Sequence, residues 1–146
     1  LDICLHVADS LRENLDTPIP DVPGWMRKRV EDGHLGAKSG EGIYVWEDGK
    51  PKKGKPADHL LPKDAQDRLI LPMLNAAVEC LRKDVVADAE TLDAAMIFAI
   101  GFAPFRGGPM HYARQRGIDE VVGALDDLAG RHGPRFAPDK GWKDLG

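Results

Sequence analysis

The feature that most constrains the fold is an internal repeat at an offset of 117 residues. The repeat aligns Leu1-Asp2 with Ile118-Asp119, Asp9 with Asp126, Leu11 with Leu128, and Gly24-Trp25 with Gly141-Trp142. Apolar helix faces often coincide by chance, whereas a Gly-Trp pair rarely falls in the same register. The repeat therefore predicts the tail of one helical unit followed by a nearly complete second copy.

From residue 63 onward, apolar residues recur with the spacing of helices. One helix face is expected at Ile70, Leu74, Ala77, Val78, Leu81 and Val85. A second helix, capped by Asp88 and ended by Gly101, would bury Leu92, Ala95, Met96, Ala99 and Ile100. Gly108-Pro109 predicts the start of a third helix that Gly117 stops, and a fourth follows from Ile118. We expect a mainly α fold, a helical bundle with one short β element.

The first 62 residues predict a smaller helical segment and a linker. We expect helices over 1–13 and 22–32, a proline-rich turn at 17–20, and a glycine turn leading into a strand over 43–46. The lysine-, proline- and glycine-containing stretch 47–62 lacks apolar periodicity and is interpreted as a solvated linker. The predicted domains are 1–46, 47–62 and 63–146. Because the first helix begins without a capping residue, we expect a piece of a longer protein.

Composition and charge exclude several classes of protein. The net charge of −4 argues against a nucleic-acid-binding surface, which is normally basic. The longest apolar stretch, 94–103, is far shorter than the roughly 20 residues that cross a bilayer, so we expect no membrane span. Cys4 and Cys80 are interpreted as buried reduced thiols, which favours a cytoplasmic location.

The residues alone reveal no active site. The five histidines have no metal-ligand spacing, and the serines lack a nucleophile motif. Ala37-Lys38-Ser39 is reminiscent of a phosphate-binding loop, but that motif requires glycine before the lysine and a helix after it. No glycine-rich dinucleotide motif is present. We therefore predict no catalytic, cofactor-binding or metal-binding residues within the chain.

The loop Gly101-Phe102-Ala103-Pro104-Phe105-Arg106-Gly107-Gly108-Pro109 is unusually rich in glycine and aromatic residues for a connection between two helices. Phe102 and Phe105 could fill the core at a tight interhelical corner. Alternatively, the glycines and rings could form a ligand or subunit contact, because glycine permits close backbone approach and phenylalanine offers a flat apolar wall. Both interpretations remain open from the sequence.

Several segments together resemble the C-terminal domain of 3-hydroxyacyl-CoA dehydrogenases. They are residues 67–75, Glu79-Cys80-Leu81, residues 92–96, the loop 101–109, and Lys38-Ser39-Gly40-Glu41-Gly42-Ile43-Tyr44. The last resembles the signature that closes the first copy, although Ala37 stands where the family has arginine. The match is closest to the multifunctional α subunits of fatty-acid β-oxidation, which carry two such domains in tandem. The resemblance implies a bundle similar to the C-terminal domain of 6-phosphogluconate dehydrogenase.

The resemblance also implies a function for the whole enzyme, namely oxidation of L-3-hydroxyacyl-CoA with NAD. The helical region would pack against an upstream Rossmann domain, shape the acyl-CoA cleft and mediate subunit association, with a thiolase subunit as a further partner. The catalytic His–Glu pair and asparagine would precede Leu1, and Asp67 would replace that asparagine in the second copy. Fused enoyl-CoA hydratase activity is also expected.

Phe98 is the one candidate substrate-binding residue that the resemblance implies for this chain. It occupies a position where the multifunctional relatives have a substrate-facing tyrosine, but it also fits a buried helical position. Overall, we expect the chain to be inactive alone, without bound NAD. The alternative is an independent helical binding or dimerisation module without catalysis.

Overall fold

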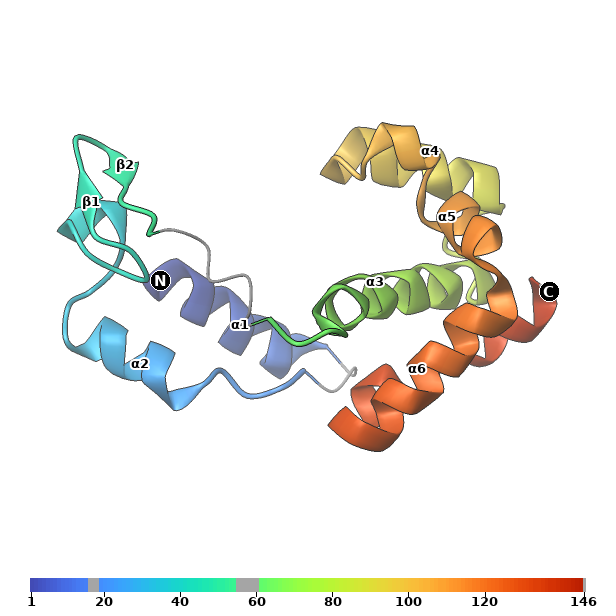
Figure 1. Ribbon diagram of the computed structural model, residues 1–146, viewed down its shortest axis with the longest axis horizontal. Helices are drawn as coiled ribbons and strands as arrows, with labels where there is room; N and C mark the ends of the chain where they lie inside the picture. The colour runs from blue at the N-terminus through green and yellow to red at the C-terminus, as the bar shows by residue number, and fades with distance from the viewer. Residues whose placement is uncertain (16–18, 55–60, 146) are drawn as a thin grey trace. The chain divides into compact units, whose positions relative to one another are not determined.

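The computed structural model describes residues 1–15, 19–54 and 61–145. The described elements are α1 (Asp2–Asn14), α2 (Gly24–Glu31), η1 (Ala37–Ser39), β1 (Trp46–Glu47), β2 (Lys50–Pro51), α3 (Ala65–Arg82), α4 (Ala89–Ile100), η3 (Pro104–Arg106), α5 (Pro109–Arg116), α6 (Ile118–His132), η4 (Pro134–Phe136) and η5 (Lys140–Asp144). The η elements are short 3₁₀ helices. The architecture is mainly α, as predicted (Figure 1).

The chain divides into two compact units, residues 1–59 (unit 1) and 60–146 (unit 2). Unit 1 contains α1, α2, η1 and a two-residue antiparallel hairpin in which Trp46 pairs with Pro51. The strand predicted over 43–46 therefore starts too early, because Ile43 and Tyr44 lie in a bend and β1 begins only at Trp46. Its partner β2 lies in the predicted linker. Part of the proline-rich turn and residues 55–60 lie outside the described residues.

Local signals define both ends of α4 and the start of α5 as predicted, whereas α3 ends at Arg82, so Val85, expected on its apolar face, lies beyond the helix and is exposed. The Asp88 carboxylate accepts a hydrogen bond from the Thr91 N–H at 2.7 Å, and so caps α4. Gly101 ends α4 in the left-handed conformation, with φ +74°. Pro109 is the first residue of α5, where its missing N–H costs no helix hydrogen bond.

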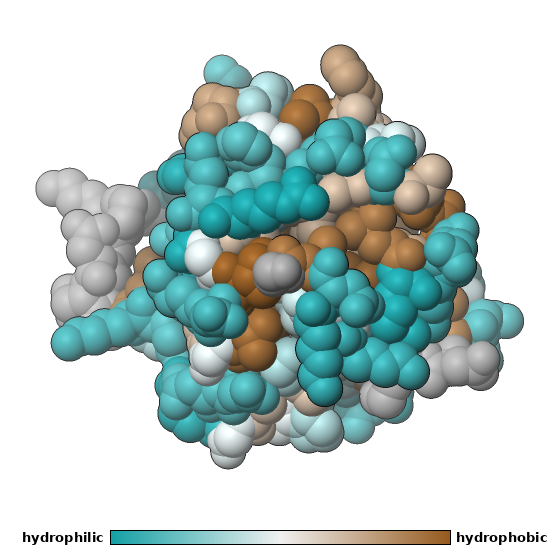
Figure 2. All heavy atoms as spheres, turned by 90° about the vertical axis from the view of Figure 1, so that its right-hand side faces the viewer, coloured by the Kyte–Doolittle hydropathy of each residue, from teal (hydrophilic) through white to brown (hydrophobic). Residues whose placement is uncertain are grey.

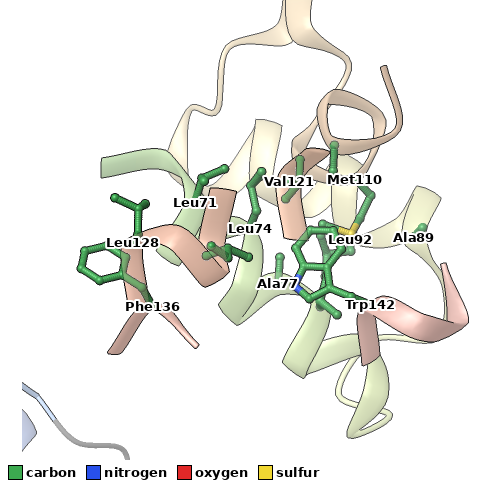
Figure 3. Close-up of a cluster of buried hydrophobic side chains, with 13 residues drawn as sticks. Leu71, Leu74, Ala77, Ala89, Leu92, Met110, Val121, Leu128, Phe136 and Trp142 are labelled. Carbon is green, nitrogen blue, oxygen red and sulfur yellow. The ribbon is translucent and has the colours of Figure 1, made fainter. Parts of the chain in front are cut away.

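The core of unit 2 is built from α3, α5 and α6, with contributions from α4, η4 and η5. Thirteen buried residues form one hydrophobic cluster, namely Leu71, Leu74, Ala77, Val78, Ala89, Leu92, Met110, Ala113, Val121, Leu125, Leu128, Phe136 and Trp142 (Figure 3). The apolar face predicted for α4 is wrong in its second half, since Ala95, Ala99 and Ile100 are exposed. This half of α4 extends beyond the packed interior and leads into the 101–109 loop.

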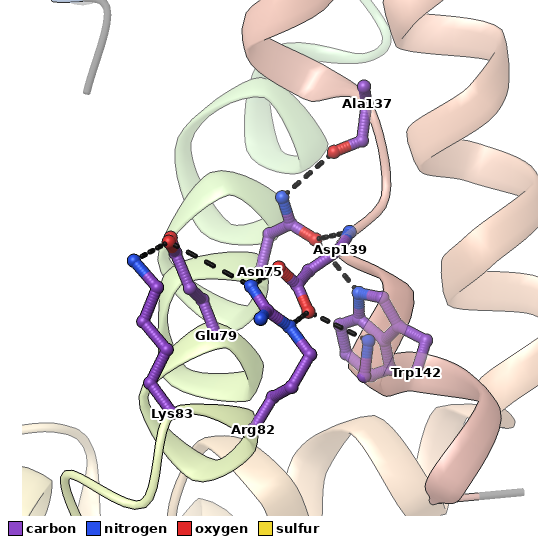
Figure 4. Close-up of polar contacts among 8 residues, drawn as sticks. Asn75, Glu79, Arg82, Lys83, Ala137, Asp139 and Trp142 are labelled. Carbon is purple, nitrogen blue, oxygen red and sulfur yellow. Dashed lines mark hydrogen bonds and ion pairs between the residues drawn. The ribbon is translucent and has the colours of Figure 1, made fainter. Parts of the chain in front are cut away.

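A polar network fastens the C-terminal segment to α3 (Figure 4). The Asn75 side chain donates to the Ala137 carbonyl at 3.0 Å and accepts from the Asp139 N–H and the Trp142 indole N–H at 2.7 and 2.8 Å. Nearby, the Arg82 guanidinium donates two hydrogen bonds to the Asp139 carboxylate, both at 2.7 Å. This pairing lowers the pKa of Asp139 below its usual value of 3.8.

Acidification is expected to weaken this network below about pH 4. Because the folded-state pKa of Asp139 is lowered, the unfolded chain binds more protons in this range, and stability falls as pH falls through the folded pKa. We expect the ion pair to contribute about 1 kcal/mol that is present near neutral pH and lost in acid. Urea unfolding at about pH 6 and about pH 3 should therefore show a smaller acid loss in Asp139→Asn than in the natural sequence. Equal losses would contradict the role of this pair.

The surface of the molecule is mixed in polarity. On the face shown in Figure 2, hydrophobic residues gather in a central area bordered by hydrophilic ones. None of the described helices combines the length and apolar character that crossing a membrane requires. Both cysteines are free, but the prediction that they are buried is wrong, because Cys4 is exposed and Cys80 is only partly buried.

Candidate functional site

A groove of about 370 Å³ opens in unit 2 beside the 101–109 loop. Its lining comes from α3, from the end of α4 and the loop that follows, and from α5. The lining residues are Gln66, Ile70, Met73, Ile100, Gly101, Phe102, Ala103, Phe105, Arg106 and Tyr112. The volume lies within the range of about 300–1,000 Å³ that is typical of ligand pockets. We treat this groove as the candidate functional site.

The buried carboxylate of Asp93, on α4, binds the start of α5 at the end of the 101–109 loop. This side chain is 8% exposed and accepts hydrogen bonds from the Met110 and His111 N–H groups at 2.6 and 2.9 Å. It thus satisfies two N–H groups of the first turn of α5, whose partners cannot come from within the helix. The loop is consequently held at both ends, by α4 itself and by Asp93.

At Gly108 the loop backbone passes close to the Asp93 side chain of α4. Gly108 has φ +104°, and a Cβ atom placed there would lie 2.3 Å from the Asp93 Cβ and 2.5 Å from its Oδ1. Only glycine can combine this backbone conformation with this contact. The glycine pair of the loop is evident in the sequence, but no sequence pattern identifies Asp93 as its structural partner.

Arg106 carries the only formal charge among the residues that line the groove. Its guanidinium carbon lies 5.6 Å from the ring centroid of Phe105 and 5.7 Å from that of Tyr112. These distances are within the range of cation–π attraction, which favours arginine over aromatic faces. The site is therefore a mainly apolar groove whose lining includes one cation, near two aromatic rings.

Comparison with known proteins adds a family context to this geometry. No protein-family model matches the chain. The chain is 32% identical to a protein named fatty acid oxidation complex subunit alpha from Idiomarina loihiensis, over 94% of its own length. It is 38% identical to the protein of that name from Vibrio vulnificus over 75% of its length, and 35% identical to that from Acinetobacter baumannii over 88%. Its homologues are fatty acid oxidation complex alpha subunits. The chain spans only about a fifth of their length, 17–21%.

The aromatic residues singled out in the sequence do not behave as core residues. Phe98 is 87% exposed and does not line the groove, so its interpretation as a buried residue is wrong. Its contact with substrate stays a prediction. Phe105 is 85% exposed at the groove, which also overturns its interpretation as a core plug. Phe102 is partly buried and lines the groove.

Asp67 is engaged in an ion pair away from the groove lining. Arg116 donates to its two carboxylate oxygens at 2.6 and 3.0 Å, and to Glu120 at 2.8 Å. The Asp67 hydrogen bonds, followed by the Glu120 hydrogen bond, raise the pKa of the Arg116 guanidinium. The Asp67–Arg116 ion pair thus joins α3 to α5, which indicates a structural role for Asp67.

The Lys38–Tyr44 turn in unit 1 is also held by local contacts. Lys38 forms an ion pair with Asp2 in the first turn of α1. The Ser39 hydroxyl accepts from the Leu35 N–H at 2.8 Å and lies 2.8 Å from the Glu41 carbonyl, to which it donates. The turn leads into a bend and a hairpin, whereas a phosphate-binding loop would open a helix. The lysine therefore fastens the turn to α1.

Proposed function

We propose that this chain is the C-terminal helical region of an NAD-dependent 3-hydroxyacyl-CoA dehydrogenase of fatty acid β-oxidation. In that enzyme it would shape the acyl-CoA cleft and contribute subunit contacts. The observation that carries the proposal is the match of 75–94% of the chain to fatty acid oxidation complex alpha subunits at 32–38% identity. An apolar groove walled by the 101–109 loop is consistent with a role beside an acyl substrate.

The described residues do not form a Rossmann-type NAD site. Such a site is built on a parallel sheet whose glycine-rich turn opens a helix. Within residues 1–15, 19–54 and 61–145, the sheet structure consists of the antiparallel β1–β2 hairpin. We therefore assign NAD and the catalytic residues to a Rossmann domain elsewhere in the full-length protein. We further propose a cytoplasmic enzyme with fused enoyl-CoA hydratase activity that associates with a thiolase subunit.

A chimera tests the proposal directly. The segment of the Idiomarina loihiensis alpha subunit that aligns with this chain would be replaced by residues 1–146, and reduction of NAD by a 3-hydroxyacyl-CoA would be followed. We expect the chimera to keep dehydrogenase activity to within about tenfold, because the transplanted helices would restore the same scaffold. Enoyl-CoA hydratase activity of the chimera serves as the folding control. Normal hydratase activity without any dehydrogenase activity would refute the proposal, as would NAD binding by the chain alone.

One observation favours the alternative of a binding or dimerisation module. Along α1, Ile3, Val7 and Leu11 are 68, 48 and 44% exposed, an apolar surface of the kind found at protein interfaces. Under this alternative, the chain alone would form a stable dimer without acyl-CoA, measurable by light scattering. The chimera would then lack dehydrogenase activity.

A further inference from the structure

The internal repeat allows the two units to be compared position by position. Adding 117 to the bounds of α1 gives 119–131, which lies within α6, and the same shift places Gly24-Trp25 of α2 on Gly141-Trp142 of η5. In both units, a longer helix is therefore followed by a shorter one that contains the Gly-Trp pair. The contacts that α1 makes in unit 1 thus provide a template for the equivalent face of α6 in unit 2.

One face of α1 is occupied by other parts of unit 1. The lysine of the Lys38–Tyr44 turn forms an ion pair with Asp2 at the start of this face. Further along, Arg27 of α2 donates two hydrogen bonds to the Asp9 carboxylate, at 2.6 and 3.0 Å. Leu5 lies between the two aspartates at helical spacing and is the buried residue of α1. Both carboxylates on this face are therefore neutralised by cations from outside the helix.

The equivalent face of α6 is open to solvent. It borders a pocket of about 500 Å³ within unit 2, which we call the α6 pocket. Asp119, Val122 and Asp126 occupy the positions of the three α1 residues just described. Within the part of the chain that the structure describes, neither of these aspartates forms an ion pair. The lining residues are Ile118, Asp119, Val122, Asp126, Pro138, Asp139, Lys140, Trp142 and Lys143.

The sequence explains why Asp126 lacks the partner that its equivalent has. The position of Arg27 is occupied in unit 2 by Asp144, which repels another carboxylate instead of binding it. Asp139, the third aspartate of the lining, already pairs with Arg82 at 2.7 Å. The α6 wall of the pocket is therefore acidic, and a cation from another chain would gain a partner there.

The η5 wall of the pocket carries the opposite charge. Lys140 and Lys143 are exposed and line the pocket. Trp142, which is 3% exposed, contributes apolar surface together with Ile118 and Val122 of α6. A ligand that complements the whole pocket would therefore present a cation to α6 and an anion to η5. A polypeptide turn with side chains of both signs meets this requirement.

We propose that the α6 pocket is a docking site for a glycine-containing turn of a partner subunit, and that this turn presents a lysine to Asp119. The turn of unit 1 is the pattern for this ligand, because Lys38 pairs there with the equivalent of Asp119 and Glu41 follows three residues later. The choice of a partner subunit rests on the subunit contacts of the proposed function. The need for a lysine rests on the carboxylates of α6 and on the contacts of α1.

A peptide of residues 33–46 serves as the probe, because it contains the whole turn of unit 1. Titrated into the ¹⁵N-labelled 146-residue chain, it should shift the amide resonances of residues 118–122 and 140–143. We expect a Kd of about 0.1–1 mM, because the contact is small and solvent-exposed. The peptide with Lys38→Met should bind about fivefold more weakly, which is the effect of one exposed ion pair. Shifts confined to α1 would show only exchange with the chain's own turn and would overturn the inference.

Two substitutions in the chain locate the binding. Asp119→Asn should weaken binding of the natural peptide about fivefold and leave the affinity of the Lys38→Met peptide unchanged, because that peptide has no cation to lose. Asp119 is exposed, so its replacement leaves the core intact. Asp127→Asn is the matched control, since Asp127 is exposed on the same helix and pairs with Arg131 but does not line the pocket.

The outcomes separate this inference from the proposed function. No binding of the peptide, or equal effects of the two substitutions, would overturn the docking site. If the peptide fails to bind while the chimera remains active, this inference fails and the proposed function stands. If the peptide binds at the α6 pocket while the chimera lacks dehydrogenase activity, the docking site stands without the dehydrogenase.

Discussion

Gly108→Ala is expected to destabilise the chain by about 3–4 kcal/mol, a large share of the stability of a small domain. The new methyl carbon would lie 2.3 Å from the Asp93 Cβ, in a backbone conformation with φ +104° that alanine rarely adopts. Moving Asp93 to relieve the contact would leave the Met110 and His111 N–H groups without their acceptor. Urea unfolding followed by far-ultraviolet circular dichroism measures the loss.

Gly123→Ala provides the matched control for this substitution. Gly123 is exposed within α6, and a Cβ placed there meets no atom within 4 Å. The same change should therefore stabilise the chain by about 0.5–1 kcal/mol, because alanine has the higher helix propensity. A Gly108→Ala protein within about 1 kcal/mol of the natural one would show that the loop can move away from Asp93.

The sequence predicts those parts of the fold that depend on neighbouring residues. Asp88 and Gly101 bound α4 as expected, because a cap acts within one turn of the helix. The exposed half of α4 could not be predicted in the same way. Ala95, Ala99 and Ile100 are as apolar as core residues, and only the tertiary arrangement decides whether another element covers them.

The candidate site was only partly visible in the sequence. The 101–109 loop stands out in the sequence because it combines two phenylalanines and an arginine with three glycines between two helices, and loops often carry function. The Asp93 anchor was missed, since its partners Met110 and His111 lie 17 and 18 residues away and no short motif joins them. The contact between Arg106 of η3 and the ring of Tyr112 likewise joins two different elements.

Trp142→Ala is expected to cost about 4 kcal/mol of stability, comparable to other large-to-small changes in protein cores. The side chain is 3% exposed within the unit 2 cluster. Its indole N–H donates to Asn75 Oδ1 at 2.8 Å, so the substitution also removes one of the three hydrogen bonds of that amide. Urea unfolding should show a lower midpoint with most of the helical signal retained before the transition.

Trp25→Ala is the internal control that the repeat supplies. Trp25 occupies the position equivalent to Trp142 after a preceding Gly24, yet it is 54% exposed. The helices that precede the two tryptophans differ in burial in the same way. Leu128 of α6 is 1% exposed, whereas its equivalent in α1, Leu11, is 44% exposed. We therefore expect Trp25→Ala to cost less than about 1 kcal/mol, because little packing is lost. A loss as large as that of Trp142→Ala would contradict the exposure of Trp25 and would mean that unit 1 packs as tightly as unit 2. The contrast measures whether the two segments that share this Gly-Trp pattern are packed equally well.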